Sequence, residues 1–354
     1  MIELSLSKKL IIKIGSSLIV DSSSSRLRIN WLKSLAHDIS KAKLRGTDVI
    51  IVSSGAIAIG RSILNLDNDN LSLEESQAAA AVGQIKLSRV YQEVLGPLGI
   101  VTAQVLLTLE DSENRRRYLN SRSTLNMLLS LKVTPIVNEN DTVATDEIRF
   151  GDNDRLAARV AQMSSSDLLI LLSDIDGLYD QNPHHSKTAK HIPLVTEINE
   201  EIMNMAGSSH YEYASGGMVT KLEAAKISSL SGCNLIICNG ESEHPILELS
   251  KGKKHTIFKA NETPLTARKK WIAAGLNILG KLIVDNGAST ALKNGSSLLP
   301  AGVVKVEGIF EKGDLVEILD QNGNIIGSGP VSYTHLRAHE TRGNLVCRLV
   351  REKK

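Results

Sequence analysis

Aromatic residues are scarce: they make up only 3% of the 354 residues, so the hydrophobic core must be built almost entirely from aliphatic side chains. Cysteine is rare as well. The three cysteines have neither the spacing of zinc ligands nor that of a disulfide framework, which favours a reducing compartment. No apolar run is long enough for a signal peptide or a membrane-spanning helix. We therefore expect a cytoplasmic protein without a membrane segment.

An excess of charge of one sign is also absent, because 41 basic residues stand against 39 acidic ones. A nearly neutral chain gives no reason to expect a polyanion as partner, so nucleic-acid binding is not favoured. Apolar residues make up 42% and charged residues 23%, as in ordinary globular proteins. Because single cores stop growing at roughly 250–300 residues, a chain of this length predicts two domains.

Short aliphatic runs alternate with longer stretches of helical spacing. The runs are too short for helices and read as buried strands, at residues 10–14, 49–52, 133–137, 168–172 and 235–238. The helical stretches lie at residues 29–44, 73–95, 118–131 and 218–230. This alternation predicts an α/β fold in which a mainly parallel central sheet has helices on both faces, a three-layer αβα sandwich. Ligands of such sheets bind at the carboxyl ends of the strands.

The pattern changes after residue 240. A basic stretch at 251–270 suggests a linker, and short strand-like runs separated by Asn-Gly and Lys-Gly-Asp turns follow it. These runs lie at residues 282–284, 303–306, 315–319 and 325–326. We expect a small β-rich second domain.

Glycine-containing turns follow the first two expected strands. KIGSS (residues 13–17) places Lys13 and Gly15 where backbone N–H groups and a positive charge can meet a phosphate, although the spacing of a Walker A loop is absent. SSGAI (residues 53–57) offers hydroxyls and backbone donors to a carboxylate. Taken alone, each segment also fits an ordinary turn.

Asparagine and aspartate gather after the third expected strand, in NEND (residues 138–141) and GDND (residues 151–154). Such residues form turns and helix N-caps. Two clusters so close together could also hold a substrate ammonium, and one carboxylate could orient lysines at a phosphate.

Two further segments suit a nucleotide. SDIDGLY (residues 173–179) follows the fourth strand, and SGGMVTK (residues 215–221) leads into a helix. A Gly-Gly turn at a helix N-terminus is a good anion site, and Lys221 lies where it can reach phosphate oxygens.

From about residue 9 to residue 268, the chain resembles the amino-acid kinase family, and within it the glutamate 5-kinases. The motifs that carry the resemblance are, in order, KIGSS, VSSGAIAIG, AAVGQ, PIVNENDTVAT, GDND, LLSDIDGLY and SGGMVTK. The resemblance implies ATP-dependent phosphorylation of the side-chain carboxylate of L-glutamate to L-glutamyl 5-phosphate, the first step of proline biosynthesis. A carboxylate is already ionised at neutral pH, so this chemistry requires no general base.

The resemblance also implies roles for single residues. Lys13 and Lys221 would flank the phosphoryl group in flight, with Asp154 holding both lysines. Glutamate would be bound by Ser54, Asp141 and Asn153. ATP would be bound by Lys13, Gly15, Ser173, Asp174, Ser215, Gly216, Gly217, Met218, Val219, Thr220 and Lys221. Mg²⁺ would accompany ATP, with no metal ligand from a protein side chain.

The stretch GASTALKNGSSLLPAGVVKVEGIFEKGDLVEI resembles a PUA module, so we divide the chain into a kinase domain (1–268) and a PUA-like domain (269–330). PUA modules elsewhere bind RNA. Residues 276–330 carry four lysines against six acidic residues, which makes RNA binding unfavourable here. Residues 331–354 depart from the family pattern and look like a translated adapter, so we expect a truncated PUA-like domain.

Further partners follow from the resemblance alone: a homo-oligomer, feedback binding of proline and a downstream glutamyl phosphate reductase. Three alternatives stay open. One is an amino-acid kinase with another acceptor, and another is an RNA-binding protein that acts through its PUA-like domain. The third is a regulatory binder of amino acids without turnover, against which the intact set of Lys13, Asp154 and Lys221 argues.

Overall fold

The computed structural model describes residues 7–21, 26–66, 71–144, 153–183, 186, 188–206, 217–267, 279–294, 296–310, 314–331 and 347–348. The chain divides into two compact units, the first comprising residues 1–113 and 120–264 and the second residues 114–119 and 265–354. No helix among the described residues combines the length and the hydropathy that a membrane span needs. Our domain limits at residues 268 and 330 stay a prediction.

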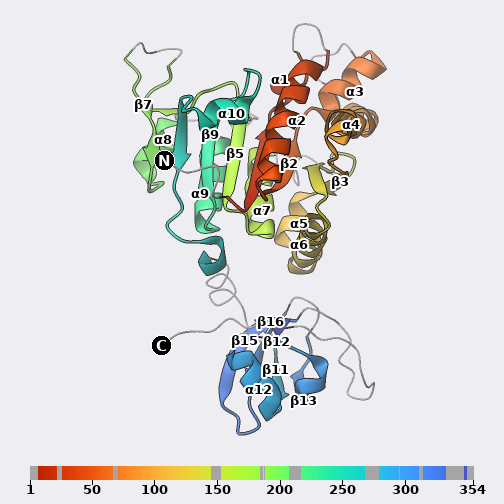
Figure 1. Cartoon of the computed structure of the whole chain (residues 1–354), viewed down its shortest axis with the longest axis vertical. Coiled ribbons are helices and arrows are strands. Elements are labelled where there is room, and N and C mark those ends of the chain that lie inside the picture. Colours follow the sequence, from red (N-terminus) through yellow and green to blue (C-terminus); the bar gives the residue numbers. More distant parts are fainter. Residues whose placement is uncertain are drawn as a thin grey trace. The chain divides into compact units, whose positions relative to one another are not determined.

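The first unit is built around an eight-stranded sheet with the order β3-β4-β2-β1-β5-β9-β10-β8 (Figure 1). Its strands are β1 (Lys9–Ile14), β2 (Asp48–Ser53), β3 (Thr102–Leu107), β4 (Thr134–Glu139), β5 (Leu168–Ser173), β8 (Leu194–Val195), β9 (Asn234–Asn239) and β10 (His255–Phe258). The strands from β3 to β9 pair in parallel, whereas β10 runs antiparallel to β9 and pairs in parallel with β8. The mainly parallel sheet predicted from the sequence is confirmed.

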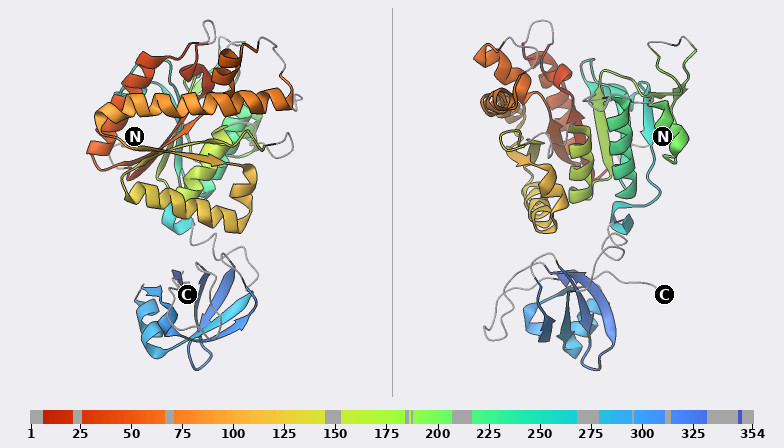
Figure 2. Two further views of the ribbon diagram at one scale, coloured as in Figure 1. Left: turned by 90° about the vertical axis from the view of Figure 1, so that its right-hand side faces the viewer. Right: turned by 180° about the vertical axis from the view of Figure 1, so that it is seen from behind.

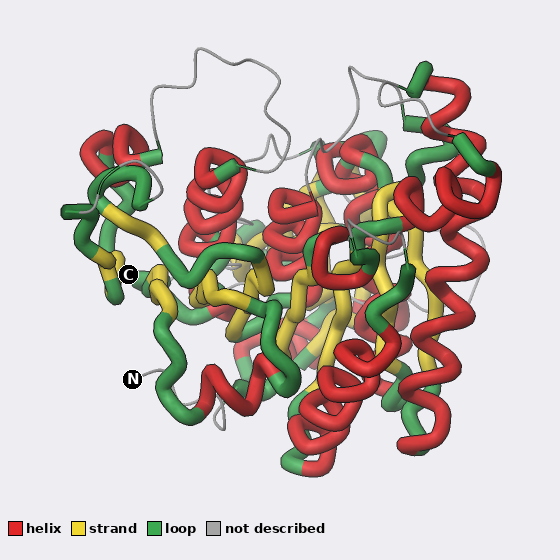
Figure 3. Tube along the Cα trace, turned by 90° about the horizontal axis from the view of Figure 1, so that it is seen from above, coloured by secondary structure: helices red, strands yellow, loops and turns green. Residues whose placement is uncertain are grey.

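Helices cover both faces of this sheet, so that the strands form a middle layer (Figure 3). Helices α2 (Ile29–Leu44), α4 (Leu73–Leu95) and α10 (Pro245–Ser250) lie on one face, and α7 (Asn153–Ser164) and α9 (Met218–Leu230) lie on the other (Figures 1 and 2). The unit also contains α1 (Ser16–Ile19), α3 (Ala56–Leu64), η2 (Gly96–Leu98), α5 (Leu109–Glu113), β6 (Leu178–Tyr179), β7 (His191–Ile192), α8 (Glu200–Met205) and, from residue 120 on, α6 (Arg115–Ser130).

The core on the α2 face is aliphatic, as the scarcity of aromatics requires. Leu10, Ile12 and Ile14 point from alternate positions of β1 into a cluster that α2 and α4 complete with leucine, valine and isoleucine. Two aromatic residues, Trp31 and Tyr91, join this cluster, and both place a polar atom on a partner. The five central strands were predictable because they are buried on both faces.

Three strands of this sheet were not predicted: β3, β10 and the two-residue β8. The edge strand β3 reads TAQVLL, and its mixture of half-exposed and polar positions lacks a continuous apolar run. Strand β10 lies within the stretch 251–270, which we expected to be a linker, and this expectation was wrong: residues 255–258 pair with β9 and extend the sheet. The basic residues around β10 concealed a strand of only four residues.

Helices α3 and α4 pack against each other at backbone distance. A Cβ atom on Gly60 would overlap the carbonyl of Ala79, and one on Gly83 would overlap the carbonyl of Ala56. Helix α4 begins with a capping box, in which Ser72 and Glu75 exchange side-chain and backbone hydrogen bonds. The close approach places Gly83 against Ala56 and Gly60, in the first half of α3.

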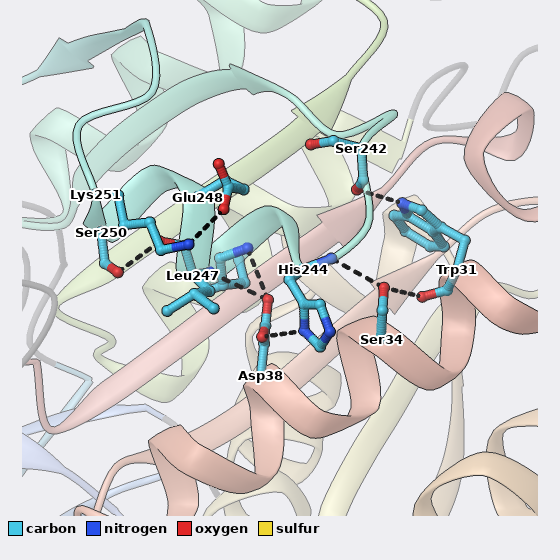
Figure 4. Close-up of polar contacts among 10 residues, drawn as sticks. Trp31, Ser34, Asp38, Ser242, His244, Leu247, Glu248, Ser250 and Lys251 are labelled. Atoms are coloured by element: carbon cyan, nitrogen blue, oxygen red, sulfur yellow. Dashed lines mark hydrogen bonds and ion pairs between the residues drawn. The ribbon is translucent and has the colours of Figure 1, made fainter.

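Asp38 of α2 forms hydrogen bonds to the start of α10 and to the residue before it (Figure 4). Its buried carboxylate accepts hydrogen bonds from the backbone N–H groups of Ile246 and Leu247, at 3.0 and 3.1 Å, and contacts Nδ1 of His244 at 2.9 Å. Helix α10 has no side-chain cap of its own, so Asp38 supplies the missing cap from another element. Trp31 holds the segment between β9 and α10 by donating to the carbonyl of Gly240 at 2.7 Å.

The second unit contains a four-stranded sheet with the order β13-β11-β14-β15. Its elements are β11 (Gly280–Val284), α12 (Asn286–Lys293), β12 (Ser297–Leu298), η3 (Pro300–Gly302), β13 (Val303–Gly308), β14 (Leu315–Leu319), β15 (Ile325–Pro330) and β16 (Cys347–Arg348). Its core holds Leu282, Val284, Leu292, Leu298, Val316, Ile318 and Val331. The β-rich second unit agrees with the sequence pattern.

We predict that Gly83→Ala destabilises the first unit, because the added methyl group cannot enter the α3–α4 contact without moving a backbone. Overpacking of this kind costs about 1–3 kcal/mol. Gly96→Ala is the matched control, since a Cβ atom there meets nothing within 4 Å. Urea unfolding followed by circular dichroism measures both variants. Equal midpoints for the two variants would contradict the proposed contact.

Candidate active site

The carboxyl ends of four strands supply the polar residues of one cavity. Lys13 is the penultimate residue of β1, Ser54 follows β2, Asp141 follows β4, and Ser173 ends β5. Parallel strands bring such residues to one edge of the sheet, because all their carboxyl ends lie on the same side. The cavity has a volume of about 710 Å³. It is lined by Lys13, Gly15, Ser16, Ser17, Ser54, Gly55, Ala56, Ile57, Ala58, Arg61, Asn138, Glu139, Asp141, Asn153, Ser173, Asp174 and Lys221.

An ion triplet lies at the base of this cavity. Nζ of Lys13 lies 2.6 Å from Oδ1 of Asp154, and Nζ of Lys221 lies 3.1 Å from Oδ2 of the same carboxylate. Asp154 has no exposed surface, and both lysine side chains are more than 90% buried. One carboxylate therefore holds two ammonium groups that would otherwise repel each other, and the triplet carries a net positive charge.

The three members come from separate elements. Lys13 is on β1, Asp154 is in the first turn of α7, and Lys221 is in the first turn of α9. The α7 and α9 helices pack against each other on one face of the sheet, which brings residues 67 positions apart into contact. The sequence prediction that Asp154 holds both lysines agrees with this geometry.

A second cavity of about 690 Å³ adjoins the first, since Asp174 and Lys221 line both. The remaining lining residues are Ile175, Asp176, Gly177, Leu178, Tyr179, Gln181, Asn182, Pro183, Met205, Ala206, Gly217, Met218, Asn239, Lys253 and Lys254. The first turn of α9, preceded by Gly217, brings backbone N–H groups to this cavity. Two adjoining cavities that share the cationic Lys221 can hold two substrates, and a negatively charged group can be transferred between them next to this lysine.

Hydrogen bonds order the wall of the second cavity. Lys254 donates to the hydroxyl of Tyr179 at 2.6 Å, and Tyr179 donates to Asp176 at 2.9 Å. The hydrogen bond to Tyr179 raises the pKa of Lys254, so this ammonium stays charged at neutral pH. Asn239 donates to the carbonyl of Asp174 at 2.9 Å and joins the ends of β5 and β9.

The sequence-predicted residues divide into four groups. Those that line the first cavity are Lys13, Gly15, Ser54, Asp141, Asn153, Ser173, Asp174 and Lys221. Gly217 and Met218 line the second cavity. Asp154 lies beneath the first cavity, and Val219 and Thr220 line neither, although both belong to the first turn of α9. Ser215 and Gly216 lie outside the described residues.

Sequence reasoning missed several lining residues. Glu139 belongs to the NEND motif and was passed over in favour of its neighbours, and Asn239 follows a buried strand as the selected residues do. The position of Asn239 at a strand end could have identified it. Lys253 and Lys254 were missed because we assigned them to a linker, and Arg61 gave no signal because it stands one helical turn into α3.

Among the described residues, no group of three or more histidine, cysteine, aspartate or glutamate side chains is placed to hold a metal ion. Carboxylates do line the first cavity, at Glu139, Asp141 and Asp174. Mg²⁺ commonly binds through one or two carboxylates and substrate phosphates, retaining several waters. The residues present therefore fit a magnesium ion that enters together with a phosphate ligand.

We predict that Asp154→Leu lowers the free energy of unfolding by about 3–5 kcal/mol, because it removes the carboxylate between two buried ammonium groups. The triple variant Lys13→Met, Asp154→Leu, Lys221→Met removes all three charges and should be markedly more stable than Asp154→Leu alone. Urea unfolding compares the two variants. If the triple variant were no more stable than the single one, repulsion between the lysines would not explain the loss.

Comparisons with known proteins agree with this arrangement. Residues 8–239 match the model of the amino acid kinase family, and residues 280–352 match that of the PUA domain. The PUA match runs to residue 352 and so includes most of residues 331–354, which we predicted to depart from the family. A carbamate kinase from Giardia lamblia bound to AMP-PNP has a similar fold, with a TM-score of 0.52 and 16% identity over 73% of this chain and 100% of that chain.

Curated relatives are much more similar. The glutamate 5-kinase of Nitrobacter hamburgensis is 52% identical over 96% of this chain and 90% of its own length. The glutamate 5-kinase of Paramagnetospirillum magneticum is 54% identical over 94% of this chain and 89% of its own. The chain belongs to the amino acid kinase family and, within it, to the glutamate 5-kinases.

Proposed function

We propose that this protein transfers the γ-phosphoryl group of ATP to the side-chain carboxylate of L-glutamate and releases ADP and L-glutamyl 5-phosphate. The observation that carries the proposal is the ion triplet at the boundary of two cavities, since Lys221 lines both. Glutamate occupies the first cavity, and ATP occupies the second with its terminal phosphate reaching Gly15 and Ser173 of the first. The names of the curated relatives support the choice of glutamate as acceptor.

The reaction is an in-line displacement. A side-chain carboxylate oxygen of glutamate forms a bond to the γ-phosphorus, the bond from that phosphorus to the β–γ bridging oxygen breaks, and the electron pair leaves with ADP. The nucleophile is ionised at neutral pH, so no protein group has to remove a proton. What the site supplies is position and positive charge, which is the main requirement of phosphoryl transfer.

Lys13 and Lys221 supply that charge. Lys221 lines both cavities and Lys13 lines the first, and one carboxylate holds both ammonium groups, so they need not reorganise as negative charge shifts onto the leaving oxygen. Asp154 does not touch the substrates in this proposal. It acts by fixing the two lysines at a spacing that their mutual repulsion would otherwise oppose.

Glutamate is bound by groups of opposite polarity. Ser54 and the backbone N–H groups at the N-terminus of α3 can donate to the α-carboxylate, and helix N-termini favour anions. Asp141 and Asn153 can accept from the α-ammonium group. The cavity therefore has hydrogen-bond donors for the α-carboxylate of an amino acid and acceptors for its α-ammonium group.

ATP is held by Gly15, Ser173, Asp174 and the segment 215–221, with the phosphates directed toward the first turn of α9. The second cavity supports this assignment, because Asp174, Gly217 and Met218 line it together with Lys221. Mg²⁺ would enter together with ATP, near the carboxylates of Glu139, Asp141 and Asp174, and would neutralise part of the phosphate charge.

Other features of the proposal rest on the family relationship alone. The enzyme acts in the cytoplasm as a homo-oligomer, binds proline as a feedback inhibitor and delivers its product to glutamyl phosphate reductase. A reductive next step suits the product, because an acyl phosphate is an activated carboxylate that hydrolyses readily.

The proposal is tested by ADP release from Mg-ATP, with glutamate, aspartate, N-acetylglutamate and uridylate offered separately and with hydroxylamine present to trap an acyl phosphate. We expect ADP release and hydroxamate with glutamate only. Removing Mg²⁺ with a chelator should abolish both. Turnover with another acceptor would support kinase activity but contradict glutamate as the substrate.

In the same assay Lys221→Ala should lower kcat by about 10²–10³-fold, the usual loss when one charge-stabilising group of an active site is removed. The matched control is Lys226→Ala, an exposed lysine on the same helix. Lys226→Ala should leave kcat unchanged. An equal loss in both variants would attribute the effect to α9 and not to the ammonium at the cavity boundary.

A further inference from the structure

A continuous series of hydrogen bonds leads from the first cavity into α4. The carboxamide nitrogen of Asn153 donates to Oδ1 of Asn138 at 2.9 Å, and the carboxamide nitrogen of Asn138 donates to Oε1 of Gln84 at 2.8 Å. Gln84 then donates to Oγ of Ser88 at 3.5 Å, and Ser88 donates to Gln104 of β3 at 2.9 Å. Asn138 and Gln84 are buried, whereas Ser88 and Gln104 lie at the surface.

The orientation of these amides follows from one backbone carbonyl. Nδ2 of Asn153 lies 2.9 Å from the carbonyl oxygen of Ser53, which can only accept, so this atom of Asn153 must be the nitrogen. Asn138 therefore presents its oxygen to Asn153 and its nitrogen to Gln84. Gln84 must in turn present Oε1 to Asn138, and every member donates away from the cavity.

Asn153 consequently uses both amide hydrogens inside the protein. They are shared among the carbonyl of Ser53, the hydroxyl of Ser54 and the oxygen of Asn138, each at 2.9 Å from Nδ2. Among the described residues none donates to Oδ1 of Asn153, and Asn153 lines the cavity. A ligand in the cavity thus meets an acceptor at this position, which suits an ammonium group and disfavours a carboxylate.

We propose that Gln84 is a positioning residue for the acceptor: acting through Asn138, it fixes the carboxamide of Asn153 with its oxygen available to the α-ammonium group of the substrate. This inference rests on the proposed function, which places an amino acid in the first cavity. Gln84 does not line that cavity and does not touch the substrate. It supports the orientation that the carbonyl of Ser53 sets: by accepting from Nδ2 of Asn138, it keeps Oδ1 of Asn138 directed at Nδ2 of Asn153.

The packing of α4 makes Gln84 suitable for this role. Gly83 allows α4 to approach α3 at backbone distance, and Gln84 is the next residue. Buried amides that are fully paired order one another, whereas a buried amide that loses its acceptor must find another or rotate. The close contact between α3 and α4 at Gly83 thus positions the neighbouring Gln84 so that its amide can accept a hydrogen bond from Asn138.

The test is steady-state kinetics of Gln84→Met, which has a similar length and volume but no strong acceptor for Asn138. We expect the KM for glutamate to rise about tenfold, the size of one lost hydrogen bond to a charged group, with kcat and the KM for ATP nearly unchanged. Gln92→Met is the matched control, because Gln92 is exposed on the same helix. Gln84→Glu keeps the acceptor oxygen and should restore most of the glutamate affinity.

A double-mutant cycle separates positioning from a structural effect. If Gln84 acts through Asn153, Gln84→Met should add little to the loss of kcat/KM for glutamate that Asn153→Ala causes. Additive losses, or an equal rise in the KM for ATP and glutamate, would overturn the inference. Wild-type enzyme that fails to form glutamyl hydroxamate would instead overturn the proposed function, so the two failures are distinguishable.

Discussion

A single buried carboxylate between two lysines is the interaction on which the site depends. Asp154 lies 2.6 Å from Lys13 and 3.1 Å from Lys221, and all three side chains are buried. Burying three charges is unfavourable unless they are arranged against one another, so the triplet requires β1, α7 and α9 to meet in one geometry. The fold supplies that geometry through a parallel sheet whose strand ends converge. The triplet in turn provides a fixed positive charge at the boundary of two cavities, which is what phosphoryl transfer to a carboxylate needs.

The acceptor side depends on neutral groups in a comparable way. Asn153 adjoins Asp154 in the sequence, and its amide is anchored on the carbonyl of Ser53 and on Asn138. In the proposed function the first residues of α7 therefore serve both substrates: Asp154 holds the lysines and Asn153 faces the amino acid. Gln84 links this arrangement to the α3–α4 contact, which exists only because glycine stands where the two backbones meet.

Much of this organisation could be predicted from the sequence, and the remainder depended on tertiary contacts. The buried strands and the polar residues at their carboxyl ends follow from local patterns, and they placed Lys13, Ser54 and Asp141 correctly along one edge of the sheet. Strand β10 was missed because basic residues surround a short run. Gln84 was not singled out although it ends the AAVGQ motif, because its partner Asn138 is 54 residues away. A hydrogen bond between residues far apart in the sequence cannot be predicted when each residue also fits its local helix or turn pattern.

The central claim is that an oxygen of the glutamate side chain becomes bonded to the γ-phosphorus at this site. Glutamate labelled with ¹⁸O in its side-chain carboxylate tests it directly, with Mg-ATP and with hydroxylamine to cleave the acyl phosphate at carbon. Because the bridging oxygen leaves with the phosphate, we expect each phosphate released from the trapped product to carry one ¹⁸O atom. Phosphate without the label would mean that water, and not glutamate, accepts the phosphoryl group, and would contradict the account.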